Sequence, residues 1–501
     1  MKVEKNHIWQ LESTYQSLPE RFYTKANPAI FPAPELVIFN EELAKELGLE
    51  KLMAELTPAE KAQLFSGMVF PEGSEPISQA YGGHQFGYFN ILGDGRAILL
   101  GERLAANGQR YDIQLKGSGR TAYSRNGDGK AVIGPMLREY LISEAMYALK
   151  IPTSRSLAVS LTGEKIYRHD FLPGAVLTRV AASHLRVGTF QFAYMGGKEE
   201  IQALADYAID RHYPQLNDFP ISGIDNRYQK LLAAVIENQA ELIAKWQLIG
   251  FVHGVMNTDN MTISGETIDY GPCAFLDEYN PAAVFSSIDS GGRYRYENQP
   301  PMGQWNLSRL ADAMLPLIDG DEDTAVALAT GELLNYAACF HDFWRNGMKE
   351  KLGISGENKA DEAIIGDLLR FMEIHRADYT NTFVRLTLES GGHDGRYLQG
   401  TGELFADDKF IKWKELWKKR QQLSESRQDN IYQQMKAANP FVIPRNFRVE
   451  DALADFAKGN ITTFLELLQA LMHPYDYNSW HQKYQELSPK PMTGYRTFCG
   501  T

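Results

Sequence analysis

Alternating apolar and polar residues predict a series of short strands in the N-terminal half of the chain. Residues 97–104 are an apolar run behind the turn Gly93-Asp94-Gly95-Arg96, which predicts a strand. Residues 111–116 alternate strictly, so we expect a strand that directs one set of side chains to each face. One face would carry Tyr111, Ile113 and Leu115, and the other Asp112, Gln114 and Lys116. Apolar runs predict two more strands, at residues 157–161 and 175–180.

Helical periodicity dominates the rest of the chain. A helix is expected at residues 41–49, and Pro135 opens another, whose apolar stripe is Leu137, Leu141, Ala145 and Leu149. Residues 228–250 predict a long helix, and a polar loop follows at 251–260. Residues 261–263 and 267–269 then flank a Ser264-Gly265-Glu266 turn, which predicts a hairpin. From about Asn306 onward the pattern is mostly helical.

This order of elements predicts an α+β protein with a two-lobed, protein-kinase-like fold. A strand-rich lobe with one prominent helix, followed by a helical lobe, is the gross plan of a protein kinase. The expected parts are an N-terminal extension (1–80), a strand-rich lobe with nucleotide-binding motifs (81–190), a helical lobe with catalytic loop and metal site (191–350) and a helical C-terminal extension (351–501). In the last part, Phe410, Trp413 and Trp417 form one face among lysines. That pattern is typical of a helix packed on a core with a solvated basic side.

Composition and charge exclude several classes of function. The 501 residues carry a formal net charge of -12, which disfavours general nucleic-acid binding but permits a local basic pocket for one small anion. Neither a secretory signal nor a membrane span is expected, because the most apolar helical stretch, 231–249, is interrupted by charges. Cys273, Cys339 and Cys499 are too few for a disulfide framework and lack zinc spacing, which indicates a reducing, cytoplasmic location.

A candidate metal site lies in the second half of the chain. Residues 253–260 read His-Gly-Val-Met-Asn-Thr-Asp-Asn, and Asp269-Tyr270-Gly271 follows the predicted hairpin. Kinases end their catalytic loop with a metal-binding asparagine and place an Asp-Phe-Gly-like triplet after a short hairpin. Asn260 and Asp269 would therefore supply the hard oxygen ligands that magnesium prefers. Taken singly, either residue would be expected to serve only a backbone turn.

The catalytic loop departs from the kinase pattern at one decisive position. Counting back from Asn260 places the kinase catalytic aspartate at Val255, which cannot accept a proton. The nearest carboxylate is Asp259. Either the protein is catalytically inactive, or its catalytic base lies at another position.

Charged residues of the strand-rich lobe suggest a phosphate site. Lys116 and Glu139, 23 positions apart (139 − 116), match the kinase lysine–glutamate ion pair, although such a pair alone is more often two solvated charges. The turns 93–96 and 117–120 combine small residues with an arginine, and Asp128-Gly129 is a tight turn that would contact a nucleotide. Arg179 interrupts an apolar strand and Arg186 follows it. Their partner would be either a structural carboxylate or a phosphate.

Several long motifs closely resemble the selenoprotein O (SelO, formerly YdiU) family. They are Gly82-Gly83-His84-Gln85-Phe86-Gly87, Gly93-Asp94-Gly95-Arg96, residues 115–121 (Leu-Lys-Gly-Ser-Gly-Arg-Thr), residues 124–129 (Ser-Arg-Asn-Gly-Asp-Gly), residues 253–261 and residues 269–275. The similarity is dense from about Pro76 to Pro301 and looser toward the C-terminus.

The resemblance implies a protein adenylyltransferase on a pseudokinase fold. Members of the family bind ATP in reversed orientation and transfer AMP to Ser, Thr or Tyr hydroxyls of proteins, and UMP transfer with manganese also occurs in the family. The resemblance assigns Asp259 as the proton acceptor and Asn260 and Asp269 to Mg²⁺ or Mn²⁺, while Glu139 remains the partner of Lys116 that the kinase pattern indicates. It assigns to the nucleotide Gly93, Gly95, Arg96, Lys116, Asp128, Gly129, Arg179, Arg186 and Asp269.

Two alternatives to adenylyl transfer stay open at this stage. One is a true kinase that uses Asp259 as a displaced base, and the other is a non-catalytic ATP-binding scaffold. The resemblance also suggests a regulatory bridge between Cys273 and Cys499, since some members carry a C-terminal selenocysteine or cysteine of this kind. Three cysteines without such a role are the simpler interpretation.

Overall fold

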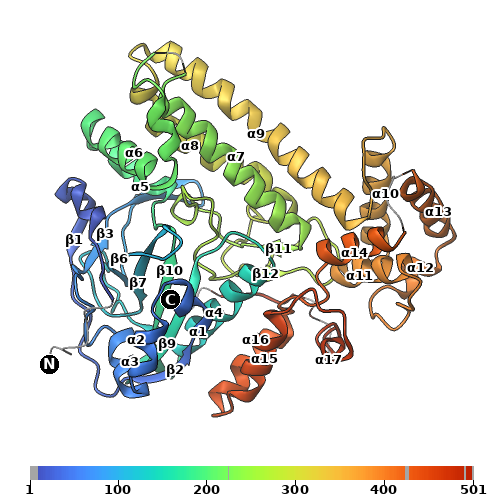
Figure 1. The fold of residues 1–501 in the computed structure, drawn as a ribbon, viewed down its shortest axis with the longest axis horizontal. Helices are drawn as coiled ribbons and strands as arrows, with labels where there is room; N and C mark the ends of the chain where they lie inside the picture. Colours follow the sequence, from blue (N-terminus) through green and yellow to red (C-terminus); the bar gives the residue numbers. More distant parts are fainter. Residues whose placement is uncertain (1–8, 224, 424–427, 490–491, 493, 499–501) are drawn as a thin grey trace.

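The chain forms a mixed α and β structure with a helical C-terminal region (Figure 1). The computed structural model describes residues 9–223, 225–423, 428–489, 492 and 494–498. This architecture agrees with the α+β class expected from the sequence. Cys499 lies outside the described residues, so its bridge to Cys273 stays a prediction.

An antiparallel eight-stranded sheet organises the N-terminal part. Its order is β1-β3-β6-β7-β10-β9-β2, and β8 pairs with β10 off this path. The strands are β1 (Tyr23–Lys25), β2 (Glu35–Phe39), β3 (Ile77–Gln79), β6 (Ala97–Leu104), β7 (Arg110–Lys116), β8 (Ala131–Val132), β9 (Arg155–Tyr167) and β10 (Phe171–Ala181). Strands β1, β2 and β3 come from the first 80 residues, so this segment pairs directly with the strands that follow it.

Helices cover both faces of the sheet. On one face, α1 (Glu41–Glu46), α2 (Glu50–Glu55) and α3 (Pro58–Phe65) share an apolar cluster with Ile113 and Leu115 of β7. On the other face, α4 (Ile133–Ala148) packs against β9 and β10 (Figure 1). The polar side of β7 faces this second layer, and Asp112, Gln114 and Lys116 are all buried there. The alternation predicted for β7 is therefore confirmed, but its polar face is an interior strip rather than a solvated surface.

The predicted strands and helices are largely confirmed, with one clear correction. Strand β6 has the predicted bounds, while β9 and β10 extend beyond the apolar runs from which they were predicted. The hairpin predicted at 261–269 is confirmed only as a single antiparallel bridge between Met261 and Thr267, not as a pair of strands. Thr262 bridges Arg186 and Thr267 also bridges Thr153, so neighbouring segments take the backbone partners that a local hairpin would have used.

Long helices build the second half of the chain. Helix α7 (Arg227–Leu248) packs against α8 (Gln299–Ile318) and α9 (Glu322–Lys351). The remaining helices are α5 (Val187–Tyr194), α6 (Lys198–His212), α10 (Asp361–Ile374), α11 (Tyr379–Ser390), α12 (Gly402–Ala406), α13 (Asp408–Gln422), α14 (Gln428–Ala438), α15 (Asn446–Ala457), α16 (Thr462–Leu471) and α17 (Ser479–Gln482). Helices α15 and α16 return to contact α4. No helix among the described residues is long and apolar enough to cross a membrane.

Helix α13 buries the aromatic face that its sequence predicts. Phe410, Trp413 and Trp417 lie in a second apolar cluster with residues of α10 and α11. The indole nitrogen of Trp413 donates to the Ile364 carbonyl at 2.9 Å, and that of Trp417 donates to the Leu352 carbonyl at 2.8 Å. Because both polar ends are satisfied, the rings can be buried without an unpaired donor.

Replacing Trp417 by alanine should destabilise this C-terminal cluster. The change removes a fully buried ring and its hydrogen bond, which we expect to cost about 3–5 kcal/mol. Thermal unfolding followed by near-ultraviolet circular dichroism should show a midpoint several degrees lower. Leu416→Ala is the matched control on the same helix, since Leu416 is 58% exposed. Equal midpoints for the two variants would contradict the packing described here.

Candidate active site

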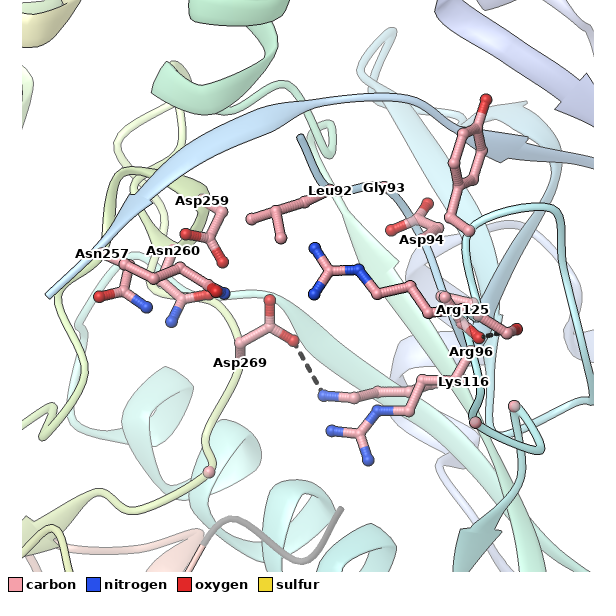
Figure 2. Close-up of a pocket in the computed structure, with 18 of the residues that line it drawn as sticks. Leu92, Gly93, Asp94, Arg96, Lys116, Arg125, Asn257, Asp259, Asn260 and Asp269 are labelled. Carbon is pink, nitrogen blue, oxygen red and sulfur yellow. Dashed lines mark hydrogen bonds and ion pairs between the residues drawn. The ribbon is translucent and has the colours of Figure 1, made fainter. Parts of the chain in front are cut away.

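A buried ion cluster lies where β7 and β10 approach α4. Lys116, the last residue of β7, donates through Nζ to Glu139 of α4 at 2.5 Å and to Asp269 at 2.9 Å. Lys116 and Glu139, which the sequence analysis pairs, are therefore in contact. Figure 2 shows Lys116 directed at Asp269 across the floor of a pocket.

Asp269 receives two arginines as well as the lysine. Arg179 donates to its Oδ1 atom at 2.7 Å, and Arg186 donates to its Oδ2 atom at 2.8 Å. Burial alone would raise the pKa of Asp269, but Lys116, Arg179 and Arg186 hold the pKa well below its ordinary value. The residue also adopts a left-handed backbone conformation, with φ of 61°, which is uncommon for aspartate. The surrounding contacts hold Asp269 in this conformation.

The two arginines are deeply buried, and their partners are carboxylates, a glutamine and the backbone carbonyl of Asp259, to which Arg186 donates at 2.5 Å. Arg179 donates to Gln114 on the neighbouring strand at 2.5 Å, and it lies 3.4 Å from Glu139. Arg186 lies over the ring of Tyr81 at 4.6 Å, and its Nε atom has no hydrogen-bond partner among the described residues. The structural carboxylate that the sequence allowed as a partner is thus present, as Asp269.

The cluster places three cations beside three carboxyl groups. Lys116, Arg179 and Arg186 face Glu139 and Asp269. A third carboxyl, Asp94, is 3.8 Å from Arg186, and burial raises its pKa to about 6 despite the opposing effect of both arginines. Ammonium and guanidinium groups that line a pocket can bind an anionic ligand such as a phosphate.

Asp259 lies at the opposite side of the same pocket. It belongs to the short helical turn Thr258–Asn260, and only 8% of the residue is exposed. Burial raises the pKa of Asp259 to about 6, although Arg186 acts in the opposite direction. Its Oδ1 atom is buried and accepts no hydrogen bond of normal geometry from the described residues. A buried carboxylate oxygen without a donor is suited to accept a proton from a ligand.

Close glycine packing fixes the position of Asp259. A Cβ atom placed on Gly83 would lie 2.6 Å from Asp259 Oδ1 and 3.0 Å from its Cβ. Gly83 belongs to a short strand, β4 (Gly82–Gln85), which Thr258 ties to the catalytic loop by accepting a hydrogen bond from the His84 amide at 2.7 Å. Only a residue without a side chain fits between this strand and the carboxylate.

The pocket brings together nearly all of the residues singled out in the sequence. Its cavity has a volume of about 670 Å³. Figure 2 shows Asp259, Asn257 and Asn260 on one side and Asp94, Arg96 and Arg125 on the other. The predicted residues that line it are Gly93, Gly95, Arg96, Lys116, Asp128, Gly129, Arg179, Arg186, Asp259, Asn260 and Asp269. Glu139 is not part of the lining and acts through Lys116.

Backbone geometry explains the glycines of the pocket. Gly93 has φ of 143°, and a Cβ atom there would lie 2.4 Å from the ring of Tyr123. Gly129 has φ of 68°, and a Cβ atom there would meet the Gly119 carbonyl oxygen at 2.1 Å. The neighbouring Asp128 accepts two hydrogen bonds from Arg168, at 2.9 and 3.0 Å, so it orients an arginine that also lines the pocket.

Some pocket residues were missed by sequence reasoning. They include Tyr81, Asp94, Tyr123, Arg125, Lys130, Arg168 and Asn257. Asp94 had a usable signal, because it lies within the quoted Gly93–Arg96 turn. Arg168 had none, since it lies in the connection between β9 and β10 and reaches the pocket only because these strands fold back over Asp128.

The pocket offers a metal ion oxygen ligands rather than a cluster of histidine or cysteine side chains. Within the described part of the chain, no group of three or more His, Cys, Asp or Glu side chains forms a metal site. The amide nitrogen of Asn260 donates to the Val255 carbonyl at 2.9 Å, which leaves its amide oxygen as the group available for a ligand. Asn260 and Asp269 both line the cavity.

Comparison with known proteins identifies the family of this chain. Residues 7–472 match the family model described as protein adenylyltransferase SelO. The chain belongs to the SelO family. A protein nucleotidyltransferase YdiU of Geobacillus kaustophilus is 55% identical to it over 98% of this chain and 99% of its own length. A protein of the same name from Clostridium beijerinckii is 51% identical over 100% and 99% of the two chains.

These similarities confirm the family resemblance read from the sequence motifs. The SelO-family chain is an enzyme of the protein nucleotidyltransferase class, and its relatives match it over nearly their full length. A nucleoside triphosphate is therefore its substrate. The non-catalytic scaffold considered in the sequence analysis is excluded by this assignment.

Gly83→Ala should lower the activity of this SelO-family enzyme without unfolding it. The added methyl group displaces the Asp259 carboxylate, while the backbone of Gly83 is already compatible with alanine. We expect the rate of nucleotide transfer to fall about tenfold or more, with ATP affinity by calorimetry nearly unchanged. Gly134→Ala is the control, because a Cβ atom on Gly134 meets nothing within 4 Å. Transfer at the unmodified rate in Gly83→Ala would contradict the packing argument.

Proposed function

We propose that this enzyme transfers AMP from ATP to Ser, Thr or Tyr hydroxyl groups of proteins and releases pyrophosphate. The observation that carries the proposal is the position of Asp259 in the cavity that the cations line. Val255 occupies the place of the kinase base, whereas Asp259 is buried, has an oxygen without a hydrogen-bond partner among the described residues, and lines the same cavity as Lys116, Arg179 and Arg186. ATP bound in the reverse of the kinase orientation would present its α-phosphate to an acceptor near Asp259.

The chemistry is a displacement at the α-phosphorus. The oxygen of the acceptor hydroxyl attacks the α-phosphorus while Asp259 accepts the hydroxyl proton. The bond from the α-phosphorus to the bridging oxygen of pyrophosphate then breaks. The leaving pyrophosphate gains negative charge, which Lys116, Arg179 and Arg186 stabilise from fixed positions. The remaining nucleotide contacts would come from Gly93, Gly95, Arg96, Asp128 and Gly129, which line the same cavity.

A divalent metal fits the oxygen donors of the pocket. Asn260 and Asp269 would hold Mg²⁺ or Mn²⁺ together with phosphate oxygens, since such ions prefer carboxylate, amide and phosphate oxygens. When bound, the ion supplies charge neutralisation at the phosphates. Asp269 accepts hydrogen bonds from Lys116, Arg179 and Arg186, which lower its pKa. The carboxylate therefore stays ionised and can bind a metal ion.

The proposal includes a kinase-like arrangement of two lobes. The antiparallel sheet with α4 would form the nucleotide-binding lobe of residues 81–190, and the catalytic loop with α7, α8 and α9 would lie in the helical lobe of residues 191–350. Its support is the contact between Lys116 at the end of β7 and Glu139 of α4, a pairing that protein kinases share.

Labelled ATP separates adenylyl transfer from phosphoryl transfer. The enzyme is incubated with Mg²⁺ or Mn²⁺ and with ATP labelled at either the α- or the γ-phosphate, and protein-bound label is followed on a gel. We expect protein-bound label from the α-position only. Label from the γ-position only would establish a kinase that uses Asp259 as a displaced base. A parallel incubation with α-labelled UTP measures UMP transfer under each metal.

Asp259→Asn should abolish transfer but not nucleotide binding. The amide is nearly isosteric but cannot accept the hydroxyl proton, so we expect the transfer rate to fall about 10²–10⁴-fold. Calorimetric titration with ATP and metal should show affinity equal to or tighter than that of the parent, because one negative charge near the phosphates is removed. Asp312→Asn, an exposed carboxylate at the same helical lobe, is the control. Full activity of Asp259→Asn would exclude it as the base.

A further inference from the structure

A separate two-stranded hairpin forms part of the rim of the pocket. It pairs β4 (Gly82–Gln85) with β5 (Tyr88–Ile91) in antiparallel register, from Gly82 opposite Ile91 to Gln85 opposite Tyr88. Phe86 and Gly87 form the turn, and both have positive φ, 51° and 91°. Such a turn twists in the same sense as the strands, which favours a tight hairpin.

The first strand of this hairpin is fixed to the catalytic loop. The His84 amide donates to Thr258 Oγ1 at 2.7 Å, and the Phe86 amide donates to Asn257 Oδ1 at 3.1 Å. Gln191 of α5 contacts both the His84 ring, at 2.8 Å, and the Thr258 hydroxyl, at 2.8 Å. The hairpin therefore cannot move independently of Asp259, which lies between Thr258 and Asn260.

The second strand, β5, is open to solvent. All four of its residues are exposed, and Tyr88 and Ile91 reach 79% and 56% exposure. Among the residues that the structure describes, β5 pairs with β4 and with no other strand. Exposed strand edges usually carry lysine, proline or a covering segment, and β5 has neither a lysine nor a proline in its sequence Tyr-Phe-Asn-Ile. The Ile91 carbonyl already accepts a hydrogen bond from Arg125, and the rest of this edge is suited to pair with an extended chain.

The direction of β5 leads into the pocket. Leu92 and Gly93, the two residues that follow the strand, both line the cavity. A chain paired along β5 would therefore pass from the exposed side chains of Tyr88 and Ile91 to the mouth of the site. Ile288, 54% exposed, also lines the cavity and offers a further apolar contact at the mouth.

Two arginines flank the open strand and define the charge of its partner. Arg125 donates to the Ile91 carbonyl at 2.9 Å, and Arg293 lies about 3.9 Å from the position of a Cβ on Gly87 while covering the Trp305 ring at 4.7 Å. Neither guanidinium forms an ion pair with a carboxylate of the described chain. The chain as a whole has a formal net charge of -12, so these two arginines give the hairpin edge a charge opposite to that of the chain.

We propose that β5 is the docking site for the acceptor protein, which adds to it as an extended segment. The segment would place apolar side chains on Tyr88 and Ile91, acidic side chains near Arg125 and Arg293, and its hydroxyl at the end of β5 that enters the pocket. The inference rests on the proposed transfer to protein hydroxyls and assigns the acceptor class to unstructured, acidic, hydroxyl-bearing segments. Main-chain pairing gives affinity in this mode, and the flanking side chains give selectivity.

The test separates acceptor binding from nucleotide chemistry. The double variant Tyr88→Ser/Ile91→Ser is compared with the parent, using dephosphorylated casein, an unstructured acidic protein, as acceptor and α-labelled ATP as donor. We expect the KM for casein to rise about tenfold, with kcat, ATP affinity and pyrophosphate release without acceptor unchanged. The matched control Leu334→Ser/Leu416→Ser removes two exposed leucines on α9 and α13, 70% and 58% exposed, and should leave the KM unchanged.

A second probe examines the backbone pairing directly. A short acidic peptide with one tyrosine is compared with the same peptide methylated at alternate backbone nitrogens, which removes the donors needed for strand addition. The methylated peptide should be a poorer acceptor for the parent enzyme, while both peptides perform equally poorly with the double variant. An unchanged KM for casein in Tyr88→Ser/Ile91→Ser, or equal labelling of the two peptides by the parent, would overturn the docking proposal. Absence of α-label on any protein with the parent enzyme would instead overturn the proposed function, and the docking site with it.

Discussion

One partly buried carboxylate, Asp269, holds three buried cations together, and the arrangement of the pocket depends on it. Lys116, Arg179 and Arg186 come from two strands and the start of a helix, and each donates to Asp269 within 2.9 Å. Without this carboxylate the three cations would repel one another in a poorly solvated interior. The left-handed backbone of Asp269 is the local strain that accompanies this convergence.

The sheet supplies the second half of this electrostatic arrangement. Strand β7 puts Ile113 and Leu115 into the apolar layer beneath α1–α3, and the same alternation puts Gln114 and Lys116 into the opposite layer. Gln114 then binds Arg179 on β10, and Glu139 of α4 binds Lys116. A polar strip is thereby kept inside the protein with partners for its charges, and its ammonium and guanidinium groups line the pocket.

The catalytic loop is connected to the surface through the β4–β5 hairpin. Thr258 and Asn257 accept hydrogen bonds from the first strand of the hairpin, and Gly83 leaves just enough space for the Asp259 carboxylate. The second strand is exposed and continues into the pocket lining. A Cβ atom on Gly82 would lie 2.7 Å from the Phe89 ring and one on Gly83 would lie 2.6 Å from Asp259 Oδ1, which explains why glycines stand at positions 82 and 83 of this strand.

The sequence by itself determined the strands with clear alternation, the long helices, the family and most of the pocket residues. The repeat of apolar residues follows the backbone repeat of a strand or a helix, so β6, β7 and α7 could be predicted from the sequence. The spacing relative to Asn260 and Asp269 was enough to single out Lys116, Glu139 and Asp259. Tertiary structure alone decided the rest. It reduced the predicted hairpin at 261–269 to one antiparallel bridge, because Arg186 and Thr153 bridge to the same segment, and it brought Arg168 to Asp128 through the fold of β9 and β10. It also decided that the polar face of β7 is buried, since burial depends on which layer packs above a strand and not on the alternation along it.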